Sequence, residues 1–247
     1  MDQKQPILEI KNLHKSFGDN HVLKAFDLKL YEGENLVIMG KSGSGKSVMI
    51  KCLVGLLAAD VGSIKIRDFE IDSLGRKELD VLRTEIGFLF QGSALYDSMT
   101  VRENLEFPLR RNNKIKNVPQ ATNTLIKEAL KNVGLSHAID LMPAELSGGM
   151  QRRVALARAL ILKPKIMLYD EPTTGLDPIT AKEIIQLMRT IQSQYHTSSL
   201  IITHDVDCAR VISNRIILLV DGTNYAEGTF KELSTSKDPK VQAFFKS

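Results

Sequence analysis

The stretch Gly40–Ser47, GKSGSGKS, constrains this chain more than any other part of its sequence. It matches the pattern G-x-x-x-x-G-K-[ST], follows the apolar segment ENLVIMG, and precedes KSVMIKCLVGLL, which has helical spacing. A glycine-rich turn between a buried strand and a helix presents backbone N–H groups to nucleotide phosphates. We therefore expect the amides of residues 42–47 to surround phosphates, Lys46 to reach the β and γ oxygens, and the Ser47 hydroxyl to bind Mg²⁺.

Composition limits the class of protein. With 247 residues, of which 43% are hydrophobic and 25% charged, the chain can form one substantial core or two unequal lobes. Its net charge of +4 is spread along the sequence, so no nucleic-acid partner is expected. Cys52 and Cys208 lack metal-ligand spacing, which favours a reducing compartment over a zinc site or disulfides. We find no signal peptide and no apolar run of about 18–20 residues, so another chain must provide any membrane crossing.

Hydrophobic patterns predict alternating strands and helices at both ends of the chain. A helix between two buried strands is typical of a parallel sheet, whereas the middle of the chain is mainly helical. Strands are expected at 7–13, 22–30, 34–40, 62–71, 86–91, 165–172 and 199–205, a hairpin at 215–230, and helices at 46–57, 99–110, 121–134, 149–162 and 177–194. Residues 110–120 are expected to form a solvated loop.

Polar residues follow two of the buried strands. The segment IMLYDEP ends in Asp170 and Glu171, and LIITHD places His204 directly after the next strand. Beside a phosphate loop, one acid at a strand end holds magnesium and the adjacent one can face the attacking water. We assign these roles to Asp170 and Glu171, with Glu171 as the general base, and expect His204 to contact the γ-phosphate. Solvated acids and a structural histidine are the alternatives.

A second glycine-rich turn lies in ELSGGMQRR, residues 145–153. Serine and two glycines before a run of good helix formers build a helix N-terminus that can hold a phosphate. The alternative is a Ser/Gly helix cap without a ligand. The residues alone do not say which phosphate a second loop would hold.

Six motifs in order resemble the ATP-binding cassette (ABC) ATPase family over essentially the whole chain. They are GKSGSGKS as Walker A, Gln91 as the Q-loop, LSGGM as the signature, IMLYDEP as Walker B, GLDP as the D-loop and THD as the H-loop. The resemblance implies a single α/β domain, 1–247, of the P-loop NTPase class. Its mixed RecA-like core sheet (1–91 and 163–247) would carry an N-terminal antiparallel β region and an inserted α-helical subdomain at about 92–162.

The resemblance also implies a set of site residues. Phe17 would stack on adenine, and Gln91 would touch magnesium and the coupling surface; a core phenylalanine and an ordinary turn residue are the alternatives. The catalytic residues would be Glu171 and His204, and the metal ligands Ser47, Gln91 and Asp170. The ATP-binding residues would be Phe17, Gly40, Lys41, Ser42, Gly43, Ser44, Gly45, Lys46, Ser47, Gln91, Ser147, Gly148, Gly149 and Asp177.

Family likeness gives the second glycine-rich turn a partner. Two cassettes of this family pack head to tail, so that the signature of one closes over the ATP held by the other. Ser147 and Gly149 would then contact the γ-phosphate in a second subunit. Because the chain has one Walker A and one signature, a two-fold dimer is the minimum closed arrangement, and a homodimer is simpler than pairing with a similar cassette.

A single compact cassette is similar to the separate ATPase subunit of a bacterial transporter. It lacks the long coiled coil of repair cassettes and the second cassette of translation-associated ones. We expect it at the cytoplasmic face of the inner membrane, docked peripherally on an integral membrane permease through residues 92–108, whose apolar side chains could also form subdomain core. A soluble cofactor-assembly or repair ATPase is the alternative.

Four segments are similar to the Mla/Mce-type (MlaF-like) ATPases, which power phospholipid movement between membranes. They are FLFQGSALYDSMTVRENLEFPLR, the signature with Met150 where many relatives have Gln, YDEPTTGLDPIT and DPKVQAFF. The resemblance implies phospholipid transport, with lipid-binding components in the periplasm. Another importer-type or lipoprotein-releasing cassette is the alternative.

Overall fold

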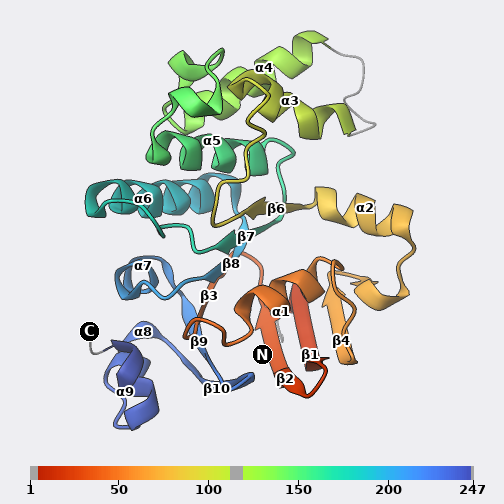
Figure 1. Ribbon diagram of the computed structural model, residues 1–247, viewed down its shortest axis with the longest axis vertical. Coiled ribbons are helices and arrows are strands. Elements are labelled where there is room, and N and C mark those ends of the chain that lie inside the picture. The colour runs from red at the N-terminus through yellow and green to blue at the C-terminus, as the bar shows by residue number, and fades with distance from the viewer. Residues whose placement is uncertain (1–4, 112–118, 246–247) are drawn as a thin grey trace. The chain divides into compact units, whose positions relative to one another are not determined.

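A computed structural model describes residues 5–111 and 119–245, which form two compact units (Figure 1). The first unit runs to Arg83 and resumes at Thr197, and the second comprises residues 84–196. The expected helical subdomain, about 92–162, lies inside the second unit and stays a prediction as a separate subdomain. Of the loop expected at 110–120, residues 112–118 lie outside the described part.

The first unit contains an antiparallel sheet built from the predicted N-terminal strands. Its order is β2 (Asn20–Leu30), β1 (Leu8–Phe17), β4 (Val61–Ile66) and β5 (Phe69–Glu70). Leu8 and Ile10 alternate as buried residues of β1, and Leu13 is buried after a register shift at Asn12, because one face of the sheet packs on apolar side chains. The strands predicted at 7–13 and 22–30 are confirmed.

A second row of strands in this unit carries the phosphate loop. Its order is β10 (Thr223–Gly228), β9 (Arg215–Val220), β3 (Asn35–Met39) and β8 (Ser198–Ile202), with β9, β3 and β8 parallel and β10 antiparallel to β9. Every residue of β3 and β8 is buried, which explains the apolar runs 36–39 and 200–202 that follow their polar first residues. The predicted hairpin at 215–230 is confirmed.

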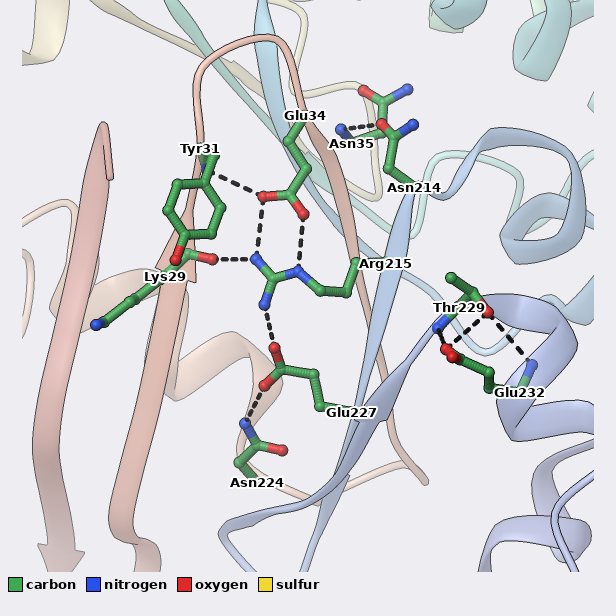
Figure 2. Close-up of polar contacts among 10 residues, drawn as sticks. All are labelled: Lys29, Tyr31, Glu34, Asn35, Asn214, Arg215, Asn224, Glu227, Thr229 and Glu232. Atoms are coloured by element: carbon green, nitrogen blue, oxygen red, sulfur yellow. Dashed lines mark hydrogen bonds and ion pairs between the residues drawn. The ribbon is translucent and has the colours of Figure 1, made fainter. Parts of the chain in front are cut away.

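Arg215 ties the strands of the first unit together (Figure 2). Its guanidinium binds both carboxylate oxygens of Glu34, at 2.8 and 3.0 Å, and also pairs with Glu227 of β10. It donates a further bond to the carbonyl of Lys29 at the end of β2. Bidentate pairing of this kind fixes geometry as well as charge, so the network holds β2, β3 and β10 around the start of β9.

The helices of the first unit are α1 (Lys46–Leu53), α2 (Arg76–Thr84, whose last residue belongs to the second unit), α7 (Val206–Ile212), α8 (Phe230–Ser234) and α9 (Pro239–Phe245); Ile71–Ser73 form a 3₁₀ turn. Helix α1 is shorter than the predicted 46–57, because Gly55 has a φ of 67° and leaves the helical conformation. The sequence patterns did not reveal α2, α7, α8 or α9.

In its described residues, the second unit packs four α-helices with two strands. Strands β6 (Ile86–Leu89) and β7 (Ile166–Asp170) pair in parallel, and the helices are α3 (Val101–Arg111), α4 (Pro119–Asn132), α5 (Gly148–Leu160) and α6 (Pro178–Tyr195). Two 3₁₀ turns, Ser136–Ala138 and Pro143–Glu145, lie between α4 and α5. Leu105 of α3, Ile126 of α4 and Val154 of α5 share one apolar core, and α3, α4 and α5 lie together in Figure 1.

No helix of the described residues is both long and apolar enough to cross a lipid bilayer.

Candidate nucleotide-binding site

The phosphate loop of the first unit depends on glycines in the left-handed conformation. Gly43 and Gly45 have φ values of 79° and 103°, and Gly45 is the residue from which α1 begins. A Cβ at Gly45 would also lie 3.0 Å from the Val22 carbonyl oxygen and 3.1 Å from a methyl carbon of Leu23. Only glycine combines this backbone angle with so close an approach to β2.

Backbone carbonyls of the phosphate loop hold the Lys46 side chain in place. Its side chain is buried, and its ammonium group donates hydrogen bonds to the carbonyl oxygens of Gly40 at 2.6 Å and Lys41 at 2.9 Å. The carbonyls fix the position of the cation against the backbone of the loop. A positive charge is therefore present where phosphates are expected.

The loop also presents donors that suit a phosphate ligand. No side chain of the described residues caps the N-terminus of α1, and the start of a helix is a favourable place for an anion. The hydroxyl of Ser44 is buried and has no hydrogen-bond partner among the described residues, which a phosphate oxygen would supply. Ser47 lies exposed in the first turn of α1. These residues fit a nucleotide phosphate.

A groove of about 770 Å³ adjoins the loop within the first unit. Its walls come from β2, from loop residues 41–44, from the β9–β10 turn and from α9. This volume is within the range of small-molecule sites. Lys240 and Phe244 of α9 line it, and no sequence motif marks either residue, because α9 is distant in the sequence from the phosphate loop.

Phe17 and His204 belong to the same unit as the loop. Phe17 ends β1 with 49% of its surface exposed, and the Lys15 ammonium lies 5.6 Å from its ring centre. His204 is exposed just after β8, whose parallel neighbour β3 leads into the phosphate loop. Residues after the carboxyl ends of adjacent parallel strands share one edge of a sheet, so His204 and the loop emerge at the same edge.

The second unit positions the two acids predicted for catalysis. Asp170 is the last residue of β7, and Glu171 follows with 9% exposure and a φ of 49°. Such an angle is strained for a residue other than glycine, by about 1–3 kcal/mol, and strain of this kind gathers at functional sites. The Thr174 hydroxyl donates a 3.1 Å hydrogen bond to the Glu171 carboxylate. Thr174 was missed, although it lies three residues beyond a predicted base.

Gln91 lies in an exposed turn that follows β6. Because Leu89 of β6 is paired with Tyr169 of β7 in parallel register, Gln91 and Asp170 leave the same edge of this strand pair. Both carry oxygen atoms of the kind that Mg²⁺ prefers. The described residues contain no cluster of three or more His, Cys, Asp or Glu side chains that could hold a metal ion.

The glycine-rich turn at residues 145–153 caps α5. The exposed Ser147 accepts a 3.3 Å hydrogen bond from the Met150 amide, and Gly148 beside it is exposed. Gly149 is buried, and a Cβ there would lie 2.5 Å from Cγ2 of Thr180 on α6. Close packing of α5 on α6 thus needs Gly149 whatever its role toward a ligand.

Asp177, the predicted D-loop residue, is the N-cap of α6. Its carboxylate accepts hydrogen bonds from the amides of Ile179 and Thr180, both at 3.0 Å. Hydrogen bonds from the Thr180 side chain and amide lower the pKa of Asp177. The carboxylate therefore stays ionised and fixes the start of α6.

The structure thus gathers Phe17, the phosphate loop and His204 in one unit, and Gln91, Ser147–Gly149, Asp170, Glu171 and Asp177 in the other. Comparison with known families identifies the protein family that has these features. The family model described as ABC transporter matches residues 23–174. The chain belongs to the ABC transporter family. It is an ATP-binding cassette and an ATPase of that family.

Curated relatives support this membership. The cassette is 40% identical to the methionine import ATP-binding protein MetN of Clostridium tetani, in an alignment that covers 92% of this chain and 70% of MetN. It is also 40% identical to the probable ribonucleotide transport ATP-binding protein mkl of Mycobacterium leprae, with 96% of this chain and 68% of mkl covered. Its identity to the chloroplastic protein trigalactosyldiacylglycerol 3 of Arabidopsis thaliana is 37%, with 96% of this chain and 73% of that protein covered.

Solved cassettes share the fold. The ATP-binding cassette MJ0796, in a dimeric post-hydrolysis state bound to ADP and Pi, superposes with a TM-score of 0.82 at 35% identity, covering 90% of this chain and 98% of MJ0796. The cbiO1 protein of Clostridium perfringens, part of the transporter complex cbiONQ, gives 0.86 at 30% identity, covering 94% and 92%. The predicted fold class, an α/β P-loop NTPase of ABC type, is confirmed.

Proposed function

We propose that this cassette is the motor of a membrane transporter that moves phospholipid between membranes. The observation that carries the motor function is the phosphate loop: Lys46 is buried against the loop carbonyls, the Ser44 hydroxyl has no partner among the described residues, and residues 41–44 line a groove of about 770 Å³. ATP is the ligand that these features and the family share. The finer assignment to lipid rests on sequence likeness.

Each site residue has a proposed task in hydrolysis. The loop amides and Lys46 hold the triphosphate, and the Phe17 ring stacks on adenine. Ser47, Asp170 and Gln91 would hold Mg²⁺, which neutralises charge on the phosphate oxygens. The Glu171 carboxylate accepts the proton of the attacking water, with Thr174 restricting its position, and His204 contacts the γ-phosphate.

A second copy of the chain completes the site in this proposal. Ser147, Gly148 and Gly149 of one copy close over ATP held by the phosphate loop of the other, with Asp177 at the same interface. The dimeric MJ0796 structure with ADP and Pi supports such a pair. Bound ATP holds the copies together, and its hydrolysis removes γ-phosphate contacts, so the copies separate and do mechanical work.

The membrane partner is proposed to be an integral permease, with the cassette bound peripherally at the cytoplasmic face of the inner membrane. The docking segment is 92–108. Tyr96 is 41% exposed, while Val101 and Leu105 are buried in the core of the second unit, so only part of this segment can meet a partner. That cbiO1 is part of a transporter complex supports the assembly.

Lipid is the preferred cargo of the transporter. The four Mla/Mce-type segments support it, as does a relative named after a galactolipid, trigalactosyldiacylglycerol. Lipid-binding components in the periplasm belong to this proposal. Methionine import is the second candidate, because the name of MetN states that activity at 40% identity.

Purification of the tagged cassette from detergent-solubilised membranes tests the proposal. We expect a multi-spanning permease to co-purify and phospholipid extracted with the complex to raise its ATPase rate in reconstituted vesicles. Methionine added to the same vesicles should leave the rate unchanged. Recovery of a soluble complex or DNA, or stimulation by methionine instead of phospholipid, would contradict it.

A further inference from the structure

Arg152 is a buried cation in the helix that follows the signature. It lies on α5, five residues after Ser147, and is 4% exposed. Its guanidinium donates one hydrogen bond to the carbonyl oxygen of Phe90, at 2.7 Å, and another to that of Thr174, at 3.2 Å. One side chain therefore joins three segments of the second unit that are far apart in the sequence.

Each of the two carbonyls belongs to a segment with a predicted site residue. Phe90 directly precedes Gln91, and Thr174 closes the turn after Glu171, where its hydroxyl also binds the Glu171 carboxylate at 3.1 Å. A continuous path of hydrogen bonds thus runs from the Glu171 carboxylate through Thr174 and Arg152 to the residue before Gln91. The path crosses the helix that carries the signature.

Stability does not explain this arrangement. Burial of a guanidinium costs several kcal/mol, and an apolar side chain of similar size often serves a core equally well. The hydrogen-bond acceptors of Arg152 among the described residues are the two carbonyls, without a carboxylate, and its buried Nε has no partner. Burial also lowers its pKa. A charge is kept here because its planar group can reach two backbones at once.

A second arginine of the same helix fixes the segment that follows Gln91. Arg158 donates a 3.1 Å bond to the Ser93 carbonyl and a 3.3 Å bond to Oδ1 of Asn104. Ser93 and Ala94 have φ values of 61° and 50°, so this segment needs such support. Helix α5 thus holds the backbone on both sides of Gln91.

We infer that Arg152 is a positioning residue that links the signature helix to the Glu171 turn and to the segment carrying Gln91. The inference rests on the proposed catalytic role of Glu171. Because Arg152 connects α5 to the turn that carries Glu171, a contact that a second copy makes at the signature alters the position of the Glu171 carboxylate. A shift of about 1 Å in a reacting group can change a rate by roughly 10²-fold.

Steady-state ATPase kinetics of the full-length Arg152→Met protein test the inference. Methionine fills the buried space without donors, so kcat should fall about 10–100-fold while KM for ATP changes less than about 2-fold. Arg189→Met, which removes the same charge from an exposed position of α6, should keep kcat within about 2-fold. If Arg152→Met does not fold, Arg152→Lys replaces it, with a smaller fall in kcat because one ammonium group replaces the two-pronged donor.

A double-mutant cycle separates positioning from general structural damage. If Arg152 acts on Glu171 through Thr174, adding Thr174→Val to Arg152→Met should lower kcat by less than the product of the two single effects. Folded variants with unchanged kcat, or with effects that multiply, would overturn the inference. A wild-type protein without ATPase activity would instead overturn the proposed function.

Discussion

The phosphate loop of the first unit and the catalytic turn of the second are stabilised in different ways. The loop is local: two glycines with positive φ and a lysine bound to carbonyls five and six residues before it make its shape from eight consecutive residues. The turn after β7 is closed by its own Thr174 and is also held from outside, by Arg152 of α5. Binding of phosphate is thus built into the sequence, whereas placement of the base depends on tertiary contacts.

The segment after Gln91 is also held by contacts from a helix, as the turn after β7 is. The completely buried Asn104 of α3 accepts from the Tyr96 amide at 2.8 Å and donates to the carbonyls of Tyr96, Met99 and Thr100. One side chain thereby fixes a turn of five residues. A substitution at Asn104 of α3 or at Arg152 of α5 should therefore disturb catalysis although neither residue is assigned a contact with ATP.

The largest expected effect is the loss of the base in the second unit. Glu171→Gln keeps the hydrogen bond with Thr174 but cannot accept a proton, so kcat should fall by about 10²–10⁴ while ATP binding persists. Phosphate release and equilibrium ATP binding measure the two properties. Glu183→Gln on the exposed side of α6 is the control. Unchanged phosphate release would remove Glu171 as the base.

Lys46→Ala tests the first unit. Loss of a charge-assisted contact of about 1.5–3 kcal/mol should weaken ATP binding roughly 10–100-fold, as calorimetry would show. Lys51→Ala removes an exposed lysine from the same helix and should leave the affinity unchanged. Normal affinity in Lys46→Ala would count against the nucleotide site itself.

Gly45→Ala should damage the loop through its backbone. The left-handed φ of 103° and the close approach to β2 predict a loss of about 1–3 kcal/mol in the free energy of unfolding, measured with denaturant. Gly92→Ala, where an added Cβ meets nothing within 4 Å, should change it by less than about 0.5 kcal/mol. Equal losses in the two variants would show that the loop is not built on Gly45.

The smallest expected effect is that of Thr174→Val. Removing one hydrogen bond of about 0.5–1.5 kcal/mol from the Glu171 carboxylate should lower kcat roughly 2–10-fold. Thr174→Ser, which keeps the hydroxyl, should retain most of the rate. If valine and serine lower kcat equally, the hydroxyl does not position the base.

The sequence alone predicted the strands around the phosphate loop, because buried parallel strands and G-x-x-x-x-G-K-[ST] are local signals. It did not predict α7 or α9, because each is only seven residues long and too short to show a helical period. Arg152 and Thr174 escaped it for a physical reason. Their acceptors are a backbone carbonyl 62 residues away and a strained glutamate, and neither leaves a pattern in residue order.

Complementation between two impaired subunits tests the central claim most directly, namely that a second copy's signature closes the site. Ser147→Arg should block the signature and Lys46→Ala should weaken ATP binding at the phosphate loop, so at an ATP concentration limiting for Lys46→Ala each variant alone should have little activity. Mixed subunits should recover part of the ATPase rate, since every heterodimer regains one intact site. A mixture no more active than either variant alone would contradict the head-to-tail pair.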